Sequence, residues 1–325
     1  MTNPERRPQE LVCGDAPTVS GVEVIEPRDV PLGGPRAMRV RRTLPQRGRS
    51  LIGAWCFLDH YGPEDVDTSG GMNVPVHPHT GLQTVSWLFA GEIEHRDSAG
   101  TVALVRPGEL NLMTAGSGIS HSERSARTTR ELHGVQLWVA LPEDARFVER
   151  RFDHYVPHTL TGEGWSAQVF LGELLGSRSP VPTWTPLLGA ELRLDAGATF
   201  LIEVDPAFEH GFLVDAGAVT VAGTDVTAGQ LAYLPPGADV LALRCGPEPA
   251  RLVLLGGPPF GEQIVMWWNF VGRSHDEIVA YRRACQEEIS AAGAGDRAMF
   301  GLPSDDPEPP LPAPTLPNAR IKPRG

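Results

Sequence analysis

Short apolar runs recur at regular intervals along most of this 325-residue chain, and turn residues separate them. Runs such as "LIGAWCFLDH", "TVSWLFAGEIEHRD" and "LHGVQLWVALP" occur from about 21 to 141, and runs of the same kind return from about 165 to 258. The chain also holds 36 glycines and 31 prolines, which favours short strands over long helices. Strands at this spacing are typical of an antiparallel sandwich or barrel.

The two apolar regions share one order of strands and turns. Ala90-Gly91 falls on Ala216-Gly217 with a shift of 126 positions (216 − 90). A second match sets "PGELNLMTAG" (107–116) on "AGQLAYLPPG" (228–237) with a shift of 121 positions (229 − 108), so the first copy holds five extra residues. We interpret the chain as an all-β protein built from two copies of one small barrel.

One helix and a proline-rich tail are expected after the second copy. Ser274 and Glu277 form a capping box at the start of "SHDEIVAYRRACQEEISAAG" (274–293), whose apolar residues lie on one face. Eight prolines in the last 25 residues exclude a helix there, so the tail either wraps a domain in extended form or is disordered. The predicted segments are a lead-in (1–20), a first barrel (21–145), a linker (146–164), a second barrel (165–272), and the helix with its tail (273–325).

Charge and cysteine content narrow the class of protein. The formal net charge is -12 and the pI is about 5.3, which argues against direct nucleic-acid binding. The basic stretch 36–49 is interpreted as solvated surface. No apolar run reaches the length of a membrane helix, and the first residues lack a signal peptide. With four scattered cysteines, these features predict a cytoplasmic monomer with reduced thiols.

Two histidines mark a candidate metal site in "PVHPHTG" (75–81). His77 and His79 precede a strand pattern, and side chains two apart on an extended chain project from the same face. Such a pair alone is more often ordinary surface or core histidine than a metal site. His121 and Glu123 repeat the same spacing after a glycine-rich turn.

Closure of the barrel would bring the two strands together. Three imidazoles and one carboxylate suit a borderline divalent metal such as iron, and less selectively Mn, Ni, Cu or Zn. Such a site would leave coordination positions open for water, O₂ or a chelating substrate. His95 and His133 are candidates for orienting the ligands.

The second copy lacks these residues at the matching positions. Glu203 and Asp205 stand in place of the first histidine pair, and Ala242 and Arg244 stand in place of His121 and Glu123. We expect the arginine to enter the pocket and the second barrel to be free of metal.

Three stretches carry a resemblance to a known family. They are "HPHTGLQTVSWLFAGEIEHRDSAG", "RPGELNLMTAGSGISHSE" and "LHGVQLWVALP", with further matches from about 21 to 290. The sequence resembles the pirins, which are bicupin proteins of the cupin superfamily. The resemblance implies two cupin-type jelly-roll barrels, with iron (Fe²⁺/Fe³⁺) bound in the first. The family's ligands match His77, His79, His121 and Glu123. One departure is Gln83, where many members carry glutamate, and we expect this residue near the cavity.

The resemblance implies two different functions. Some pirins are similar to quercetin 2,3-dioxygenases, which open a flavonol ring with O₂, and Glu123 would then also serve as the catalytic base. Other members act through a protein partner, as coregulators of transcription or modulators of metabolic enzymes. The expected partner is therefore a small aromatic substrate such as a flavonol, or a protein. The sequence leaves open whether the chain is an enzyme.

Overall fold

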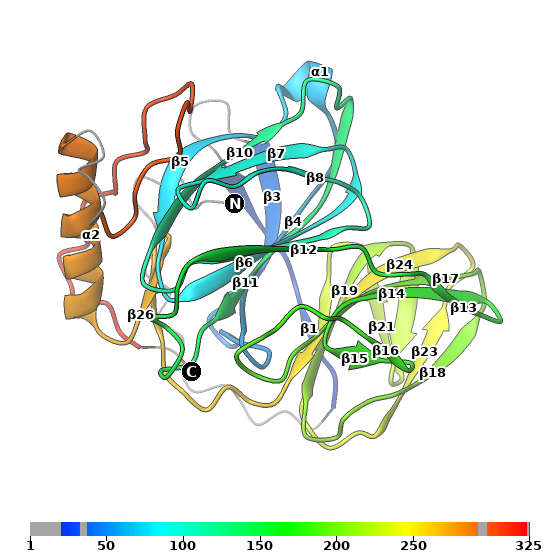
Figure 1. The fold of residues 1–325 in the computed structure, drawn as a ribbon. Helices are drawn as coiled ribbons and strands as arrows, with labels where there is room; N and C mark the ends of the chain where they lie inside the picture. The colour runs from blue at the N-terminus through cyan, green and yellow to red at the C-terminus, as the bar shows by residue number, and fades with distance from the viewer. Residues whose placement is uncertain (1–20, 33–37, 292–297, 324) are drawn as a thin grey trace.

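The protein consists of two β-barrels that pack side by side, with one long helix against the first (Figure 1). The structure is a computed structural model and describes residues 21–32, 38–291, 298–323 and 325. The predicted lead-in, 1–20, lies outside these residues. Each barrel is formed by one seven-stranded and one four-stranded antiparallel sheet.

The first barrel contains eleven of the strands. Its larger sheet has the order β12-β9-β6-β11-β4-β3-β2, and its smaller sheet the order β5-β10-β7-β8. The bounds are β2 (Arg28–Leu32), β3 (Met38–Leu44), β4 (Trp55–Asp65), β5 (Asn73–His79), β6 (Leu82–Ala90), β7 (Ile93–Asp97), β8 (Val102–Val105), β9 (Leu110–Thr114), β10 (Ile119–Ser125), β11 (Glu131–Ala140) and β12 (Arg151–Tyr155), with the short helix α1 (Val66–Ser69) after β4.

The second barrel repeats this arrangement. Its sheets have the orders β1-β22-β19-β24-β17-β14-β13 and β18-β23-β20-β21. The bounds are β1 (Glu23–Ile25), β13 (Leu160–Gly162), β14 (Trp165–Leu171), β17 (Leu188–Leu194), β18 (Thr199–Glu203), β19 (Glu209–Ala216), β20 (Ala218–Val221), β21 (Thr224–Thr227), β22 (Leu231–Leu234), β23 (Val240–Cys245) and β24 (Ala250–Gly257). Two hairpins lie outside the barrels: β15 (Glu173–Leu174) with β16 (Ser177–Arg178), and β25 (Val265–Trp267) with β26 (Phe270–Gly272).

The predicted duplication is confirmed strand by strand. The turn after β6 contains Gly91 at φ 81°, and the turn after β19 contains Gly217 at φ 76°. The shift of 126 sets β5 on β18, and the shift of 121 sets β9 on β22 and β10 on β23.

Two edge strands pair across the predicted segment boundaries, and these boundaries remain predictions. β12, inside the segment expected to be a linker, pairs with β9 of the first barrel. β1 comes from the N-terminal side of the chain and pairs with β22 of the second barrel.

The two seven-stranded sheets pack against each other through an apolar core. Trp87 of β6 stacks on Phe170 of β14, with ring centroids 4.6 Å apart, and its indole N–H donates to Glu191 at 2.7 Å. Both faces of the central strands of the first barrel are therefore buried. One face contacts the second barrel, and the other lines the interior of the first.

The interior of the second barrel is apolar, and one expectation about it is wrong. Phe200 and Ile202 of β18 and Leu241 and Leu243 of β23 are buried in one cluster. The strands alternate, so Glu203 and Arg244 are exposed. Arg244 does not enter the barrel.

The predicted helix is confirmed as α2 (His275–Ser290). Ser274 accepts the backbone N–H of Glu277 at 3.2 Å, but the Glu277 carboxylate accepts the N–H of Arg273, not that of Ser274. The tail beyond 298 runs in extended form along α2 and the first barrel, so it wraps a domain (Figure 1). Among the described residues, no helix is long and apolar enough to cross a membrane.

A buried polar cluster ties the barrels together. Asp215 of β19 accepts hydrogen bonds from His60 Nε2 at 2.7 Å and His133 Nε2 at 2.6 Å, both from the first barrel. Arg251 Nε contacts the second carboxylate oxygen at 2.6 Å, and Arg41 contacts His60. Burial raises the pKa of Asp215, but its bonds to the two histidines lower it much more, and the net pKa lies well below the usual range.

We expect Asp215→Ala to lower the free energy of unfolding by about 3 kcal/mol, because it removes the carboxylate partner of the buried His60 and His133 and of the partly buried Arg251 guanidinium. Because folding lowers the pKa of Asp215, its contribution is complete above pH ~4 and declines as the pH falls further. Denaturant unfolding at pH 7 and at pH 3 measures both effects. Asp225→Ala, at an exposed position of β21, is the matched control. A loss at pH 7 no larger than that of the control would contradict the prediction.

Candidate metal centre

The pairing of β5 with β10 brings the predicted site residues together. His121 lies directly opposite His77 in the register, and Ile119 lies opposite His79. The register shifts between His121 and Glu123, as in a β-bulge. The two histidines of "PVHPHTG" therefore face the histidine of "SHSE" across one strand pair.

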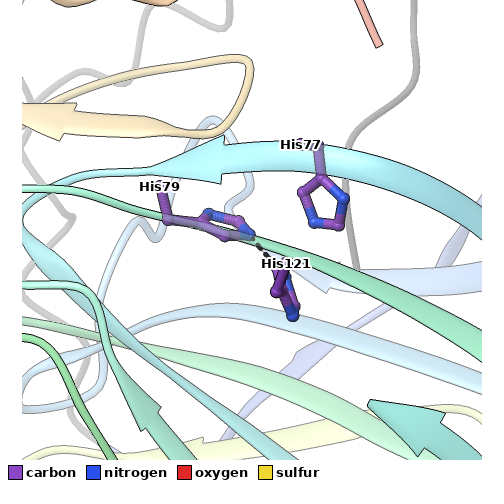
Figure 2. A group of neighbouring side chains, drawn as sticks. All are labelled: His77, His79 and His121. Atoms are coloured by element: carbon purple, nitrogen blue, oxygen red, sulfur yellow. Dashed lines mark hydrogen bonds between the residues drawn. The ribbon is translucent and has the colours of Figure 1, made fainter. Parts of the chain in front are cut away.

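The three imidazoles converge on one point inside the barrel (Figure 2). Nε2 of His79 lies 3.1 Å from Nε2 of His121, and the ring of His77 lies 4.3 Å from that of His121 between centroids. One ligand atom from each of the three residues falls within 4.8 Å of the others. All three side chains are inaccessible to solvent.

Each imidazole is oriented through its Nδ1 atom. Nδ1 of His77 donates to the carbonyl of Pro75 at 2.9 Å, and Nδ1 of His79 donates to the carbonyl of Asn269 at 3.1 Å. Nδ1 of His121 lies 3.3 Å from Nδ1 of His95. With the proton held on Nδ1, the Nε2 lone pair of each ring is left to bind a cation.

Burial keeps these rings neutral. It lowers the pKa of His77, His79 and His121 well below 6.5, and for His77 and His121 the neighbouring imidazoles lower the pKa further. Neutral imidazole is the form that binds a metal ion.

The residues present fit a metal ion. Two Nε2 lone pairs that face each other at 3.1 Å repel unless a proton or a cation lies between them. Nε2 of His77 is buried, and no hydrogen-bond partner for it exists among the described residues. A buried polar atom of this kind is retained at a cost unless a ligand satisfies it.

Glu123 lies beside this group and belongs to an overlapping one. Its carboxylate forms a cluster with His121 and His95, and Ser86 contacts Oε1 at 3.4 Å. The nearby Tyr61 hydroxyl stays protonated, because burial and the charges of Glu123 and Asp59 raise its pKa well above 10.

His95 contacts His121 from the neighbouring strand, as expected. The partner of His95 itself, Asp97, is not among the residues predicted from the sequence. His95 Nε2 donates to Asp97 at 3.1 Å, so a chain of contacts runs from Asp97 through His95 to His121. The signal for Asp97 was available, because "IEHRD" places it two positions after His95 on the same face of β7.

Two other expected neighbours of the site lie elsewhere. His133 is on the opposite face of β11 and contacts Asp215. Gln83 donates to Thr114 and is two positions from Val85, which packs in the core between the barrels. The adjacent positions, Thr84 and Ser86, are the ones that face the interior. Alternation along each strand explains both errors.

The C-terminal part of the chain supports both ligand strands from outside. Ser122 and Arg124 alternate with the ligands on β10 and point outward to Asp306 of the tail. Arg124 binds its carboxylate in a bidentate pair at 2.7 and 2.8 Å, and Ser122 donates to it at 2.5 Å. On β5, the carbonyl of Val76 accepts the N–H of Leu311 at 2.7 Å.

A glycine allows the β25–β26 hairpin to approach the histidine strand. Gly81 has φ +65°, and a Cβ at this position would lie 2.4 Å from the carbonyl oxygen of Val271. The same hairpin supplies the Asn269 carbonyl that orients His79. Any other residue at position 81 would force the hairpin away from the site.

Comparisons with known proteins agree on one family. The family model described as Pirin matches residues 37–139, and the model described as Pirin C-terminal cupin domain matches residues 189–288. A Pseudomonas aeruginosa protein named "Putative quercetin 2,3-dioxygenase" is 42% identical over 320 residues, 98% of each chain. A "Pirin-like protein" of Caulobacter vibrioides is 37% identical over 249 residues, 74% of this chain and 85% of that protein. A solved structure of quercetin 2,3-dioxygenase from Acinetobacter baumannii is similar with a TM-score of 0.84 at 36% identity, covering 93% of this chain and 98% of that chain. The two barrels are therefore cupin domains.

We expect His121→Ala to abolish stable metal binding, because His121 is the residue shared by both ligand clusters. Metal content after purification, measured by elemental analysis, tests this. His158→Ala, at an exposed histidine, is the control and should keep the metal. Equal metal content in His121→Ala and wild-type protein would refute the ligand assignment.

We expect Asp306→Asn to weaken metal binding roughly tenfold, because outer contacts that orient ligands contribute at about this level. Competition with a chelator measures the affinity. Asp305→Asn is the matched control: Asp305 is the exposed neighbour, with φ 59°, a conformation that asparagine also tolerates. Equal affinities for the two variants would show that the tail does not act on the site.

Proposed function

Because this chain belongs to the pirin family, we propose that it is a metal-dependent dioxygenase that opens the ring of flavonols, similar to quercetin 2,3-dioxygenase. The observation that carries the proposal is the convergence of three buried, neutral imidazoles, each with one ring nitrogen within 4.8 Å of the others. The names of the relatives in Pseudomonas aeruginosa and Acinetobacter baumannii support the choice of reaction.

The metal that we propose is iron, held by His77, His79, His121 and Glu123. Three imidazoles and one carboxylate suit a borderline divalent ion. When bound, iron would act as a Lewis acid on the flavonol 3-hydroxyl and would supply the redox chemistry toward O₂. The contacts of Pro75, Asn269 and His95 keep the imidazoles in the tautomer that binds the metal.

Glu123 is proposed as the base that takes the proton of the 3-hydroxyl. Its carboxylate is buried beside His121, and the Ser86 hydroxyl lies 3.4 Å from its Oε1. Removal of this proton gives the substrate oxygen a negative charge, which favours its binding at a cationic site. Exclusion of bulk water from the buried site strengthens this electrostatic interaction.

We propose that a flavonol reaches the metal from the barrel interior, because the side covered by the tail offers too little space. The cavity on that outer side is lined by His77, Pro78, Phe300 and Leu311 and has a volume of about 10 Å³. Ligand pockets for molecules of this size usually have about 300–1,000 Å³. The tail therefore closes the outer side of the barrel wall against a substrate.

We expect the iron-loaded protein, mixed with quercetin without oxygen and then exposed to air, to consume the flavonol. Loss of the flavonol absorbance measures the turnover. Metal-free protein and iron-treated His121→Ala protein are the controls and should show none. An iron-filled wild-type protein without turnover would contradict the enzymatic function. It would favour the alternative, in which the acidic protein acts by binding a partner of opposite charge.

A further inference from the structure

The interior face of the large sheet holds polar side chains next to the metal centre. In the register of β11, Gln136 lies opposite Ser86 of β6 on one side and opposite Asp59 of β4 on the other. Gly134, two positions earlier, lies opposite Tyr61. All of these positions share the face that points away from the second barrel.

This polar face is linked to the ligand Glu123. The Ser86 hydroxyl lies 2.8 Å from Oε1 of Gln136 and 3.4 Å from Oε1 of Glu123. A hydroxyl has one proton, and the shorter contact assigns it to Gln136. Ser86 therefore sets the orientation of the Gln136 amide and leaves its NH₂ group directed elsewhere.

Three hydrogen-bond donors on this face have no partner among the described residues. They are Nε2 of Gln136, the hydroxyl of Tyr61 and the indole Nε1 of Trp138. All three residues are fully buried. Most buried polar groups in proteins are hydrogen-bonded, so a group of unused donors beside one candidate metal site indicates a bound molecule that satisfies them.

The surroundings of these donors suit an aromatic ligand. Trp138, two positions after Gln136, stacks on Phe57 at 4.1 Å and presents its edge to His79 at 5.2 Å between centroids. Gly134 allows the Tyr61 hydroxyl to approach β11 closely, since a Cβ there would lie 3.0 Å from this hydroxyl and 2.7 Å from the carbonyl oxygen of Trp87. The interior thus combines aromatic side chains, three unpartnered donors and a candidate cation site.

Building on the proposed dioxygenase function, we propose that Gln136 and Tyr61 are substrate-binding residues that select aromatic compounds with a carbonyl oxygen next to a hydroxyl group. The hydroxyl oxygen would bind at the metal held by the candidate ligands. The neighbouring carbonyl oxygen accepts hydrogen bonds from the Gln136 amide and the Tyr61 hydroxyl. Ser86 is a positioning residue that holds the amide in the required orientation.

Equilibrium binding without oxygen separates this proposal from catalysis. Metal-loaded wild-type, Gln136→Met and Tyr61→Phe proteins are titrated with quercetin and with a flavan-3-ol, which has the 3-hydroxyl but lacks the 4-carbonyl. Loss of one hydrogen bond should weaken quercetin binding about three- to tenfold in each variant. The flavan-3-ol should bind all three proteins equally, because it cannot accept these bonds.

The matched control is Gln83→Met. Gln83 is also a buried glutamine, but it lies on the opposite face of β6, where its amide donates to Thr114 of β9. This variant should bind quercetin as the wild type does. Metal content and thermal unfolding of every variant show whether the site and the fold are intact.

Each outcome decides the question. Selective loss of quercetin affinity in Gln136→Met and Tyr61→Phe supports the proposal. Unchanged quercetin affinity, or an equal loss for both ligands, overturns it even if wild-type turnover is normal. If the wild type binds quercetin but does not turn it over, the proposed enzymatic function fails and the affinities still test the two donors. If the metal-loaded wild type does not bind quercetin, both proposals are wrong.

Discussion

The alternation of side chains in the central strands of the first barrel is the constraint on which the rest of the structure depends. Strands β4, β6 and β11 are buried on both faces, so each residue either packs against the second barrel or enters the first. Trp87 stacks on Phe170, whereas its neighbour Ser86 contacts Glu123. His133 binds Asp215, whereas Gln136, three positions on, faces the metal centre. Packing between the barrels therefore holds the strands that line the site in register.

The candidate centre is assembled from segments that are far apart in the chain. Its imidazoles come from β5 and β10, and their orientation comes from a carbonyl of the β25–β26 hairpin and from His95 of β7. The tail then fixes the outer faces of the same two strands through Asp306 and Leu311. Because metal affinity depends on how rigidly the ligands are held, the end of the chain is as much a part of this site as the strands that carry the ligands.

The two barrels show how one fold serves two purposes. They share the same strand order, yet the interior of the second is filled by residues such as Phe200, Ile202 and Leu243. The first keeps polar groups inside, including several without a described partner. Apolar filling stabilises a barrel directly, whereas buried polar groups are costly unless a ligand satisfies them. The second barrel thus supplies a firm packing surface, and the first holds the candidate metal site.

The sequence by itself determined the duplicated all-β architecture, the C-terminal helix and the spacing of the four candidate ligands, because these follow from local periodicity. The alternation of side chains along a strand also predicts that Asp97 shares a face with His95, two positions earlier. It likewise predicts that His133 points away from the interior of the first barrel. Only the tertiary structure decided which strands are neighbours. It set His77 opposite His121, directed Arg244 outward into solvent, and placed Asp306 behind the ligand strand. It also left Gln136 and Tyr61 beside the candidate metal site as donors without a partner among the described residues. The physical reason is that these contacts join residues far apart in the chain, and no local pattern encodes such pairings.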